Sequence, residues 1–348
     1  MKLAFYISGH GFGHISRSSV VIDALLNSFP KLEILVCSER IDFLKDHERL
    51  TKRKFQPDVG IHQKDSLTMD LETTKSLLQQ FSQKQDSLLR SETKFLQNFD
   101  PEVILTDASS FPILLGLETG IPSVFLGNFT WDFIYSAYSS LDPIFEQASN
   151  KLRVEYTFAN KALIYPFSCP TPFDRKKQIG LVGRKPTLSK ENARTYFGFS
   201  PDKKYFLLSF GAYGLDASQF VWEKLPKDCV VVTNKLPSFS NYNVLAIEDC
   251  YYPDLVTACD TVVTKPGYGI LSETYFANTP IFYTERGDFP EYPVLVKEMG
   301  LHHHAKKIEF EELYSFKFTS MKADLPVNES PKLQDGTKDV LEELEEYL

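Results

Sequence analysis

The 348-residue sequence has no excess of positive charge. Its 46 Asp and Glu residues outnumber its 38 Lys and Arg residues, and the formal net charge is −8. Proteins that bind nucleic acid neutralise phosphates with a basic face, and much of their affinity depends on that charge. No nucleic-acid partner is therefore expected.

A long hydrophobic run is also missing. The first apolar stretch extends only from Leu3 to Ile7, and no basic segment precedes it. A membrane span needs ~18 consecutive apolar residues, and a secretory signal needs a basic start. We therefore expect a cytoplasmic protein, with peripheral membrane contact only if one of its substrates is a lipid.

Cysteine is scarce and scattered. The five cysteines form no CxxC pair, which argues against a disulfide framework and against a zinc site. The consecutive histidines at 302–304 point in different directions on a helix or a strand, and no second ligand cluster accompanies them. Neither a metal ion nor another cofactor is expected.

The sequence does contain an alternation of buried strands and amphipathic helices, which begins with a strand–helix–strand unit and restarts past the middle of the chain. This pattern predicts an α/β protein with two Rossmann-like, doubly wound domains facing a cleft. The expected boundaries are an N-terminal domain at 1–168, a Pro-rich and basic linker at 169–188, a C-terminal domain at 189–330 and an acidic helix at 331–348.

A glycine-rich stretch, SGHGFGHISR at 8–17, lies between the first strand and the first helix. Gly9, Gly11 and Gly13 permit positive φ and close approach of the backbone to a ligand. A dinucleotide fingerprint would need glycine at position 14 or 16, and a P-loop would need GK[ST]. Acids near the next strand keep a nicotinamide site open as an interpretation, and so does a plain tight turn with two incidental histidines.

A second glycine turn, KPGYGILSE at 265–273, connects a buried strand to a helix. Backbone amides at such a helix start can hold a diphosphate, and Glu273 is placed to bind a ribose diol. The alternative is an ordinary glycine turn followed by a solvated glutamate. Another turn, SFGAYG at 209–214, follows a strand of the same half and is expected at the same edge of a parallel sheet.

Together these motifs resemble GT-B glycosyltransferases, including family 28. The segments GHGFGH, DSLTMD, NFTWDFIY, YYPDL, KPGYGILSE and RGDFPEYPVL occur in an order that resembles the glycosyltransferase-like N-terminal half of plant L-arabinokinases. The resemblance covers residues 7 to about 300. The sugar-kinase domain of arabinokinases has no counterpart in this sequence, so the resemblance does not imply kinase activity.

The resemblance implies an acceptor side in the first half. His14 would act as the general base on an acceptor hydroxyl, with Asp107 orienting its ring. From the residues alone, Asp107 reads as the N-cap of a helix. Trp131 would stack on a sugar and Asp132 would bind its hydroxyls, although a buried aromatic cluster is the alternative for this segment. The acceptor loop would further include Gly9, His10, Gly11, Gly13 and Arg17.

The resemblance implies a donor side in the second half. Glu273 would bind the ribose, Gly267 and Gly269 the diphosphate, and Asp288 and Glu291 the hydroxyls of the donor sugar. Arg286 would balance phosphate charge in place of a metal. The remaining donor-side candidates are Gly211, Tyr213 and Lys265.

The expected function is transfer of a sugar from a nucleotide-diphosphate donor, with UDP as the expected nucleotide, to an acceptor hydroxyl with inversion at the anomeric carbon. The partners would be this nucleotide sugar and an acceptor that the sequence does not specify. Two alternatives stay open, namely a non-catalytic module that binds nucleotide sugars and a nicotinamide-dependent oxidoreductase.

Overall fold

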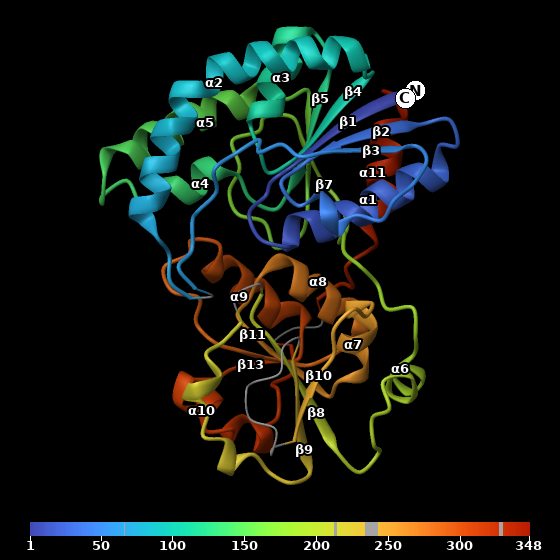
Figure 1. Ribbon diagram of the computed structural model, residues 1–348, viewed down its shortest axis with the longest axis vertical. Helices are drawn as coiled ribbons and strands as arrows, with labels where there is room; N and C mark the ends of the chain where they lie inside the picture. The colour runs from blue at the N-terminus through green and yellow to red at the C-terminus, as the bar shows by residue number, and fades with distance from the viewer. Residues whose placement is uncertain (66, 212–213, 234–242, 327–329) are drawn as a thin grey trace.

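The computed structural model describes residues 1–65, 67–211, 214–233, 243–326 and 330–348. It contains two parallel β-sheets, one in each half of the chain (Figure 1). The first sheet has seven strands in the order β3 (Leu50–Arg53), β2 (Glu33–Cys37), β1 (Lys2–Ile7), β4 (Val103–Asp107), β5 (Ser123–Gly127), β6 (Lys161–Ile164) and β7 (Lys176–Gln178). This order reverses between β1 and β4, where an open α/β sheet forms its binding crevice.

The second sheet has six strands and reverses in the same way. Its order is β10 (Val244–Ala246), β9 (Cys229–Thr233), β8 (Lys204–Ser209), β11 (Thr261–Thr264), β12 (Ile281–Tyr283) and β13 (Ala305–Lys307). The reversal lies between β8 and β11. The chain therefore has two doubly wound α/β halves, as the alternating pattern of strands and helices predicts.

Helices cover both faces of the sheets. They are α1 (Gly13–Ser28), α2 (Leu71–Phe99), α3 (Phe111–Thr119), α4 (Trp131–Ser136), α5 (Pro143–Thr157), α6 (Lys190–Tyr196), α7 (Tyr252–Ala258), α8 (Tyr268–Ala277), α9 (Tyr292–His302), α10 (Phe310–Tyr314) and α11 (Gly336–Glu345). Short 3-10 turns occupy Ile41–Phe43, Ala217–Gln219, Trp222–Lys224 and Lys317–Ser320. None of the helices in the described ranges is long and apolar enough to cross a membrane.

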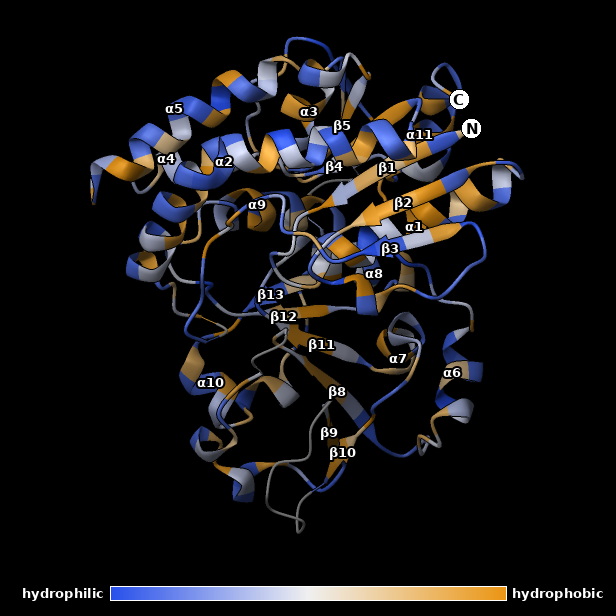
Figure 2. Cartoon of the chain, turned by 45° about the horizontal axis from the view of Figure 1, so that its top comes forward, coloured by the Kyte–Doolittle hydropathy of each residue, from blue (hydrophilic) through white to orange (hydrophobic). Residues whose placement is uncertain are grey.

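Burial on both faces explains the apolar strands. In β1, Leu3 and Phe5 pack in the core that contains α1, whereas Ala4 and Tyr6 pack in the core that contains α2 and α3. Parallel strands covered on both sides read as nearly continuous apolar runs. Figure 2 shows this as a predominance of hydrophobic colouring along β1 and β2.

The segments outside the two predicted domains are part of the packed structure. The predicted linker at 169–188 contributes strand β7 to the first sheet. The acidic helix α11 packs on α1, and Val340 and Leu344 are fully buried in the same core as β1 (Figure 1). Both chain termini consequently lie side by side on the first half.

The two glycine turns meet where the halves face each other. Gly13 begins α1, and Gly269 lies in the first turn of α8. A Cβ atom on Gly269 would lie 3.3 Å from the Cα atom of Gly13, so the two backbones are in van der Waals contact. Glycine at both positions brings the N-terminal ends of two helices to one place.

Candidate active site

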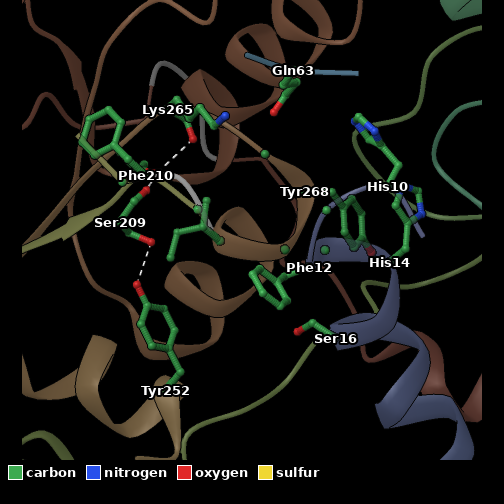
Figure 3. Close-up of a pocket in the computed structure, with 18 of the residues that line it drawn as sticks. His10, Phe12, His14, Ser16, Gln63, Ser209, Phe210, Tyr252, Lys265 and Tyr268 are labelled. Carbon is green, nitrogen blue, oxygen red and sulfur yellow. Dashed lines mark hydrogen bonds between the residues drawn. The ribbon is translucent and has the colours of Figure 1, made fainter. Parts of the chain in front are cut away.

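A cavity of about 990 Å³ opens between the two halves. Its walls come from the glycine loop after β1, the loop after β3, and the carboxyl ends of β8, β9 and β11 with the start of α8. Figure 3 shows His10, Phe12, His14 and Ser16 on one side of it, and Ser209, Tyr252 and Lys265 on the other. The volume is in the range of small-molecule sites.

A buried His–Asp pair lies on the wall formed by the first half. Nδ1 of His14 is 2.6 Å from Oδ1 of Asp107, which is the last residue of β4. Burial favours the neutral acid, but Arg17 and His14 outweigh that effect and hold the pKa of Asp107 well below its ordinary value. Asp107 is therefore an ionised acceptor, Nδ1 of His14 carries the proton, and Nε2 is the ring nitrogen that can accept another one.

Arg17 occupies the remaining sites on Asp107. Its Nε and Nη2 atoms donate to the two carboxylate oxygens at 2.7 Å, and Ser18 Oγ donates at 3.0 Å. The guanidinium contacts both Tyr165 and Tyr268, whose rings stack on each other, and its carbon lies 5.1 and 4.9 Å from their centroids. Because Tyr268 belongs to α8, a residue of the second half helps to hold the Asp107 cluster.

Asp58 is a second buried carboxyl in the cavity wall, and no motif in the sequence points to it. It accepts hydrogen bonds from Ser8 Oγ and from Trp131 Nε1, both at 3.0 Å. Burial raises its pKa to about 6, although His14 and the two donors oppose that shift. It comes from QPDVG, a loop segment without a recognisable motif, so its role is visible only in the folded chain.

His10 lies in the same wall, where its ring contacts aromatic side chains. Its ring stacks on Phe289 with a centroid distance of 6.1 Å and meets the edge of Trp131 at 5.2 Å. Burial, followed by the nearby His14 and Arg286, lowers the pKa of His10 well below the ordinary value. The ring is neutral and contributes a flat, partly apolar surface.

On the opposite wall, α8 begins at the cavity with Gly267, which has no side chain of its own to cap the helix. Glu273, in the second turn of α8, accepts from Arg184 Nε at 2.8 Å and Nη2 at 2.6 Å, and from Ser16 Oγ at 3.4 Å. All three contacts fall on Oε1. Burial raises the pKa of Glu273, while Arg184 opposes the shift. The sequence analysis missed Arg184, which comes from the predicted linker.

Two cationic residues line the cavity beside α8. Burial and then the neighbouring Arg286 lower the pKa of Lys265 to about 7. Arg286 donates from Nη1 to the carbonyl of Pro266 at 3.1 Å and to Glu291 Oε2 at 2.8 Å. Glu291 is buried and also accepts from Asn128 of the first half at 2.8 Å. Its carboxylate is thus shared between the two halves.

The structure brings most of the predicted site residues to this one cavity. Those that line it are Gly9, His10, Gly11, Gly13, His14, Arg17, Gly211, Lys265, Gly267, Gly269, Glu273, Arg286 and Glu291. Asp107 lies directly behind His14. Tyr213 falls outside the described residues. In the ranges that the structure covers, no group of three or more His, Cys, Asp or Glu is arranged to hold a metal ion.

Besides Asp107, three predicted residues in the described ranges are not part of the cavity lining, namely Trp131, Asp132 and Asp288. Trp131 is buried in an aromatic cluster, where its indole donates to Asp58. Asp132 is buried on α4 next to Arg153, with Nε of Arg153 3.4 Å from Oδ2. Asp288 is exposed, and its carbonyl accepts from Tyr138 Oη. Trp131 and Asp132 are thus packed inside the first half, whereas the side chain of Asp288 is exposed.

Comparisons with known proteins agree with this architecture. No family model matches the chain. L-arabinokinase of Arabidopsis thaliana is 28% identical over 307 residues, which cover 85% of this chain but only 29% of that protein. The resemblance to L-arabinokinase is thereby confirmed, and this chain spans less than a third of the length of that protein.

Solved glycosyltransferases share the fold over nearly the whole chain. CalG4, the calicheamicin glycosyltransferase, superposes with a TM-score of 0.65 at 13% identity and covers 100% of this chain and 98% of its own. Arabidopsis thaliana UGT89C1 in complex with quercetin gives 0.65 at 15% identity, with 99% of both chains covered. The same enzyme with UDP gives 0.61 at 13%, with 99% of this chain and 90% of that chain covered. The chain therefore has the GT-B fold.

Proposed function

We propose that this GT-B chain binds a nucleotide-diphosphate sugar, with UDP as the nucleotide, and transfers the sugar to an acceptor hydroxyl with inversion. The observation that carries the proposal is the shared cavity. A buried His–Asp pair lines one wall, and a helix N-terminus followed by a buried glutamate lines the other. The structure of UGT89C1 with UDP, a protein of the same fold, supports the choice of nucleotide.

Each wall has the chemistry for one half of the reaction. Amide groups at the start of α8 favour an anion, and Arg286 adds positive charge beside them. The pKa of Lys265 is lowered to about 7, and a bound diphosphate would favour its charged form. Glu273 has one carboxylate oxygen, Oε2, outside its contacts with Arg184 and Ser16, and this oxygen can accept a bond from a ribose hydroxyl. Because these cations can balance the diphosphate, we propose that no metal ion takes part.

The proposed step moves one proton and exchanges one bond. The acceptor oxygen attacks the anomeric carbon as its proton passes to Nε2 of His14, and the bond from that carbon to the diphosphate oxygen breaks. The nucleoside diphosphate leaves with the electron pair. Asp107 keeps the proton of His14 on Nδ1 and stabilises the imidazolium that forms.

The test combines binding with turnover. Calorimetric titration with UDP and a panel of UDP-sugars should show binding, and Glu273→Ala should weaken it by about tenfold or more. With the best donor and a pool of sugar, phenolic and lipid acceptors, His14→Ala should lower transfer by ~10²–10⁴ while leaving UDP affinity unchanged.

His304→Ala is the matched control, because this histidine is exposed and away from the cavity. It should retain full binding and transfer. No heat with any nucleotide would reject the donor site, and loss of less than about twofold in His14→Ala would reject the base. Binding without any transfer would favour the alternative, a module that senses nucleotide sugars.

A further inference from the structure

Five buried polar side chains form a continuous hydrogen-bonded network across the cleft. Arg17 donates to Asp107 at 2.7 Å and from Nη1 to Oδ1 of Asn128 at 2.6 Å. Nδ2 of Asn128 donates to Glu291 Oε1 at 2.8 Å, and Arg286 donates to Glu291 Oε2 at 2.8 Å. The network therefore runs from Asp107, behind His14, to Arg286 on the donor wall.

Within this network, Asn128 is the residue that connects the two halves of the protein. It follows β5 directly and is fully buried. Arg17 can only donate and an ionised Glu291 can only accept, so the orientation of the amide between them is dictated by its partners. A side chain at this position must accept on one side and donate on the other, which an amide does and a carboxylate or an aliphatic group does not.

At the His14 end of this network, the geometry is sensitive to small shifts of Arg17. Oδ1 of Asp107 accepts from His14 Nδ1 at 2.6 Å and from Arg17 Nη2 at 2.7 Å, and these two nitrogens are 3.0 Å apart. Two donors thus compete for one oxygen. The position of the guanidinium, which Asn128 holds at its outer edge, determines how closely the His14 ring approaches that oxygen.

The other end of the network, Arg286, lies where the charge of a bound ligand would act on it. Arg286 lines the cavity, and its guanidinium lies 4.2 Å from the centroid of the Phe289 ring. Its buried Nε has no hydrogen-bond partner within the described part of the chain. A diphosphate at the start of α8 would attract this guanidinium and compete with Glu291 for it. Any shift of Glu291 would pass to Asn128.

We propose that Asn128 is a positioning residue that, through Arg17 and Glu291, couples a nucleotide diphosphate on the donor wall to the geometry of the His14–Asp107 pair. This coupling rests on the proposed function for its ligand, whereas the placement of Arg17 by Asn128 does not. Other ionisable groups face His14, namely Asp58 from the loop after β3 and His10 from the glycine loop. Among the residues that the structure describes, the side chain of Asn128 bonds instead to Arg17, Glu291 and the carbonyl of Phe167.

The experiment follows the His14 ring by NMR in protein labelled with ¹⁵N-histidine, with His14→Gln to assign its signal among the seven histidines. In wild type, UDP should shift the Nδ1–H proton signal of His14. In Asn128→Ala this signal should already be displaced without ligand, and UDP should bind within about threefold of wild-type affinity yet leave the signal unmoved. The kcat for transfer should fall about tenfold or more with little change in KM.

Gln85→Ala is the matched control, because Gln85 is also a buried amide that donates to a buried glutamate, at 2.9 Å to Glu155, away from the cavity. It should leave the His14 signal and its response to UDP as in wild type. Asn128→Asp, which keeps the shape and the acceptor for Arg17, should lose the response as well and serves if Asn128→Ala does not fold.

The outcomes separate this inference from the proposed function. If UDP fails to bind wild type, the donor site is wrong, and the ligand-free comparison of wild type with Asn128→Ala still decides the placement of Arg17. An unchanged His14 signal in the ligand-free variant overturns the inference. A full UDP response in Asn128→Ala overturns it too, even where transfer is observed.

Discussion

Asp58 shows at the scale of one residue how burial turns an ordinary carboxyl into a pH-dependent liability. Burial raises its pKa to about 6 from 3.8, so the folded chain binds a proton there more readily than the unfolded chain. The sign follows directly: keeping Asp58 ionised costs stability as pH rises from about 4 to about 6, and the cost is constant above that range. It amounts to at most about 3 kcal/mol.

We therefore expect Asp58→Asn to gain stability relative to wild type as the pH rises. The amide stays neutral, although it serves the donors Ser8 and Trp131 less well than the carboxylate does. Urea unfolding at pH 4.5 and pH 8 measures the difference, with Asp202→Asn at an exposed site as the control. A difference that is independent of pH would show that Asp58 keeps its ordinary pKa in the folded chain.

At this scale, the motifs singled out residues that lie in or just after glycine turns, and they did not point to residues from segments without such a pattern. His14 and Glu273 follow glycine turns, and a helix start in an α/β protein has a predictable chemistry. Asp58, Arg184 and Asn128 come from segments with no such pattern. Trp131 and Asp132 looked like sugar ligands because aromatic and acidic residues suit both a sugar site and a buried cluster.

At the scale of elements, strand and helix patterns predicted most of the two sheets. Buried apolar strands such as β1 and β11 are recognisable because both faces are covered. Strands β3 and β7 are rich in Lys and Arg and lie at the sheet edges, so apolar periodicity does not indicate them. Between β8 and β9 the described residues form two short 3-10 turns, Ala217–Gln219 and Trp222–Lys224, in place of the longer helix that usually connects parallel strands.

The attachment of α11 depends on two glycines. A Cβ atom on Gly336, the first residue of α11, would lie 2.1 Å from the carbonyl oxygen of Gly180. Because the obstacle is backbone, Gly336→Ala should displace the helix and destabilise the protein by about 2–3 kcal/mol in urea unfolding. Gly300→Ala in α9 meets nothing within 4 Å and should be neutral or slightly stabilising. Equal effects of the two substitutions would show that α11 is not docked this way.

At the scale of the whole molecule, one of the hydrophobic clusters extends across both halves. The cluster that contains Leu3 and Phe5 of β1 continues through Tyr268 and Leu271 of α8 to Leu344 of α11. The sequence predicted two domains joined by a linker, because a repeated α/β pattern carries no information about which faces pack against each other. The contacts of α1 with α8 and α11 show that the second half and the C-terminal helix complete the packing of the first.

The hydrophobic cluster that spans both halves and the hydrogen-bonded network through Asn128 predict cooperative unfolding. Apolar surface that one half buries against the other is lost if either half unfolds, so calorimetry should give a single transition. UDP at 100 times its Kd should stabilise that transition by about 2.7 kcal/mol. A fragment limited to 1–168, which lacks β7, α8 and α11, should show little cooperative unfolding by circular dichroism. Two transitions, with only the later one raised by UDP, would instead mean that the halves are energetically independent and that Asn128 has no stable bridge to hold.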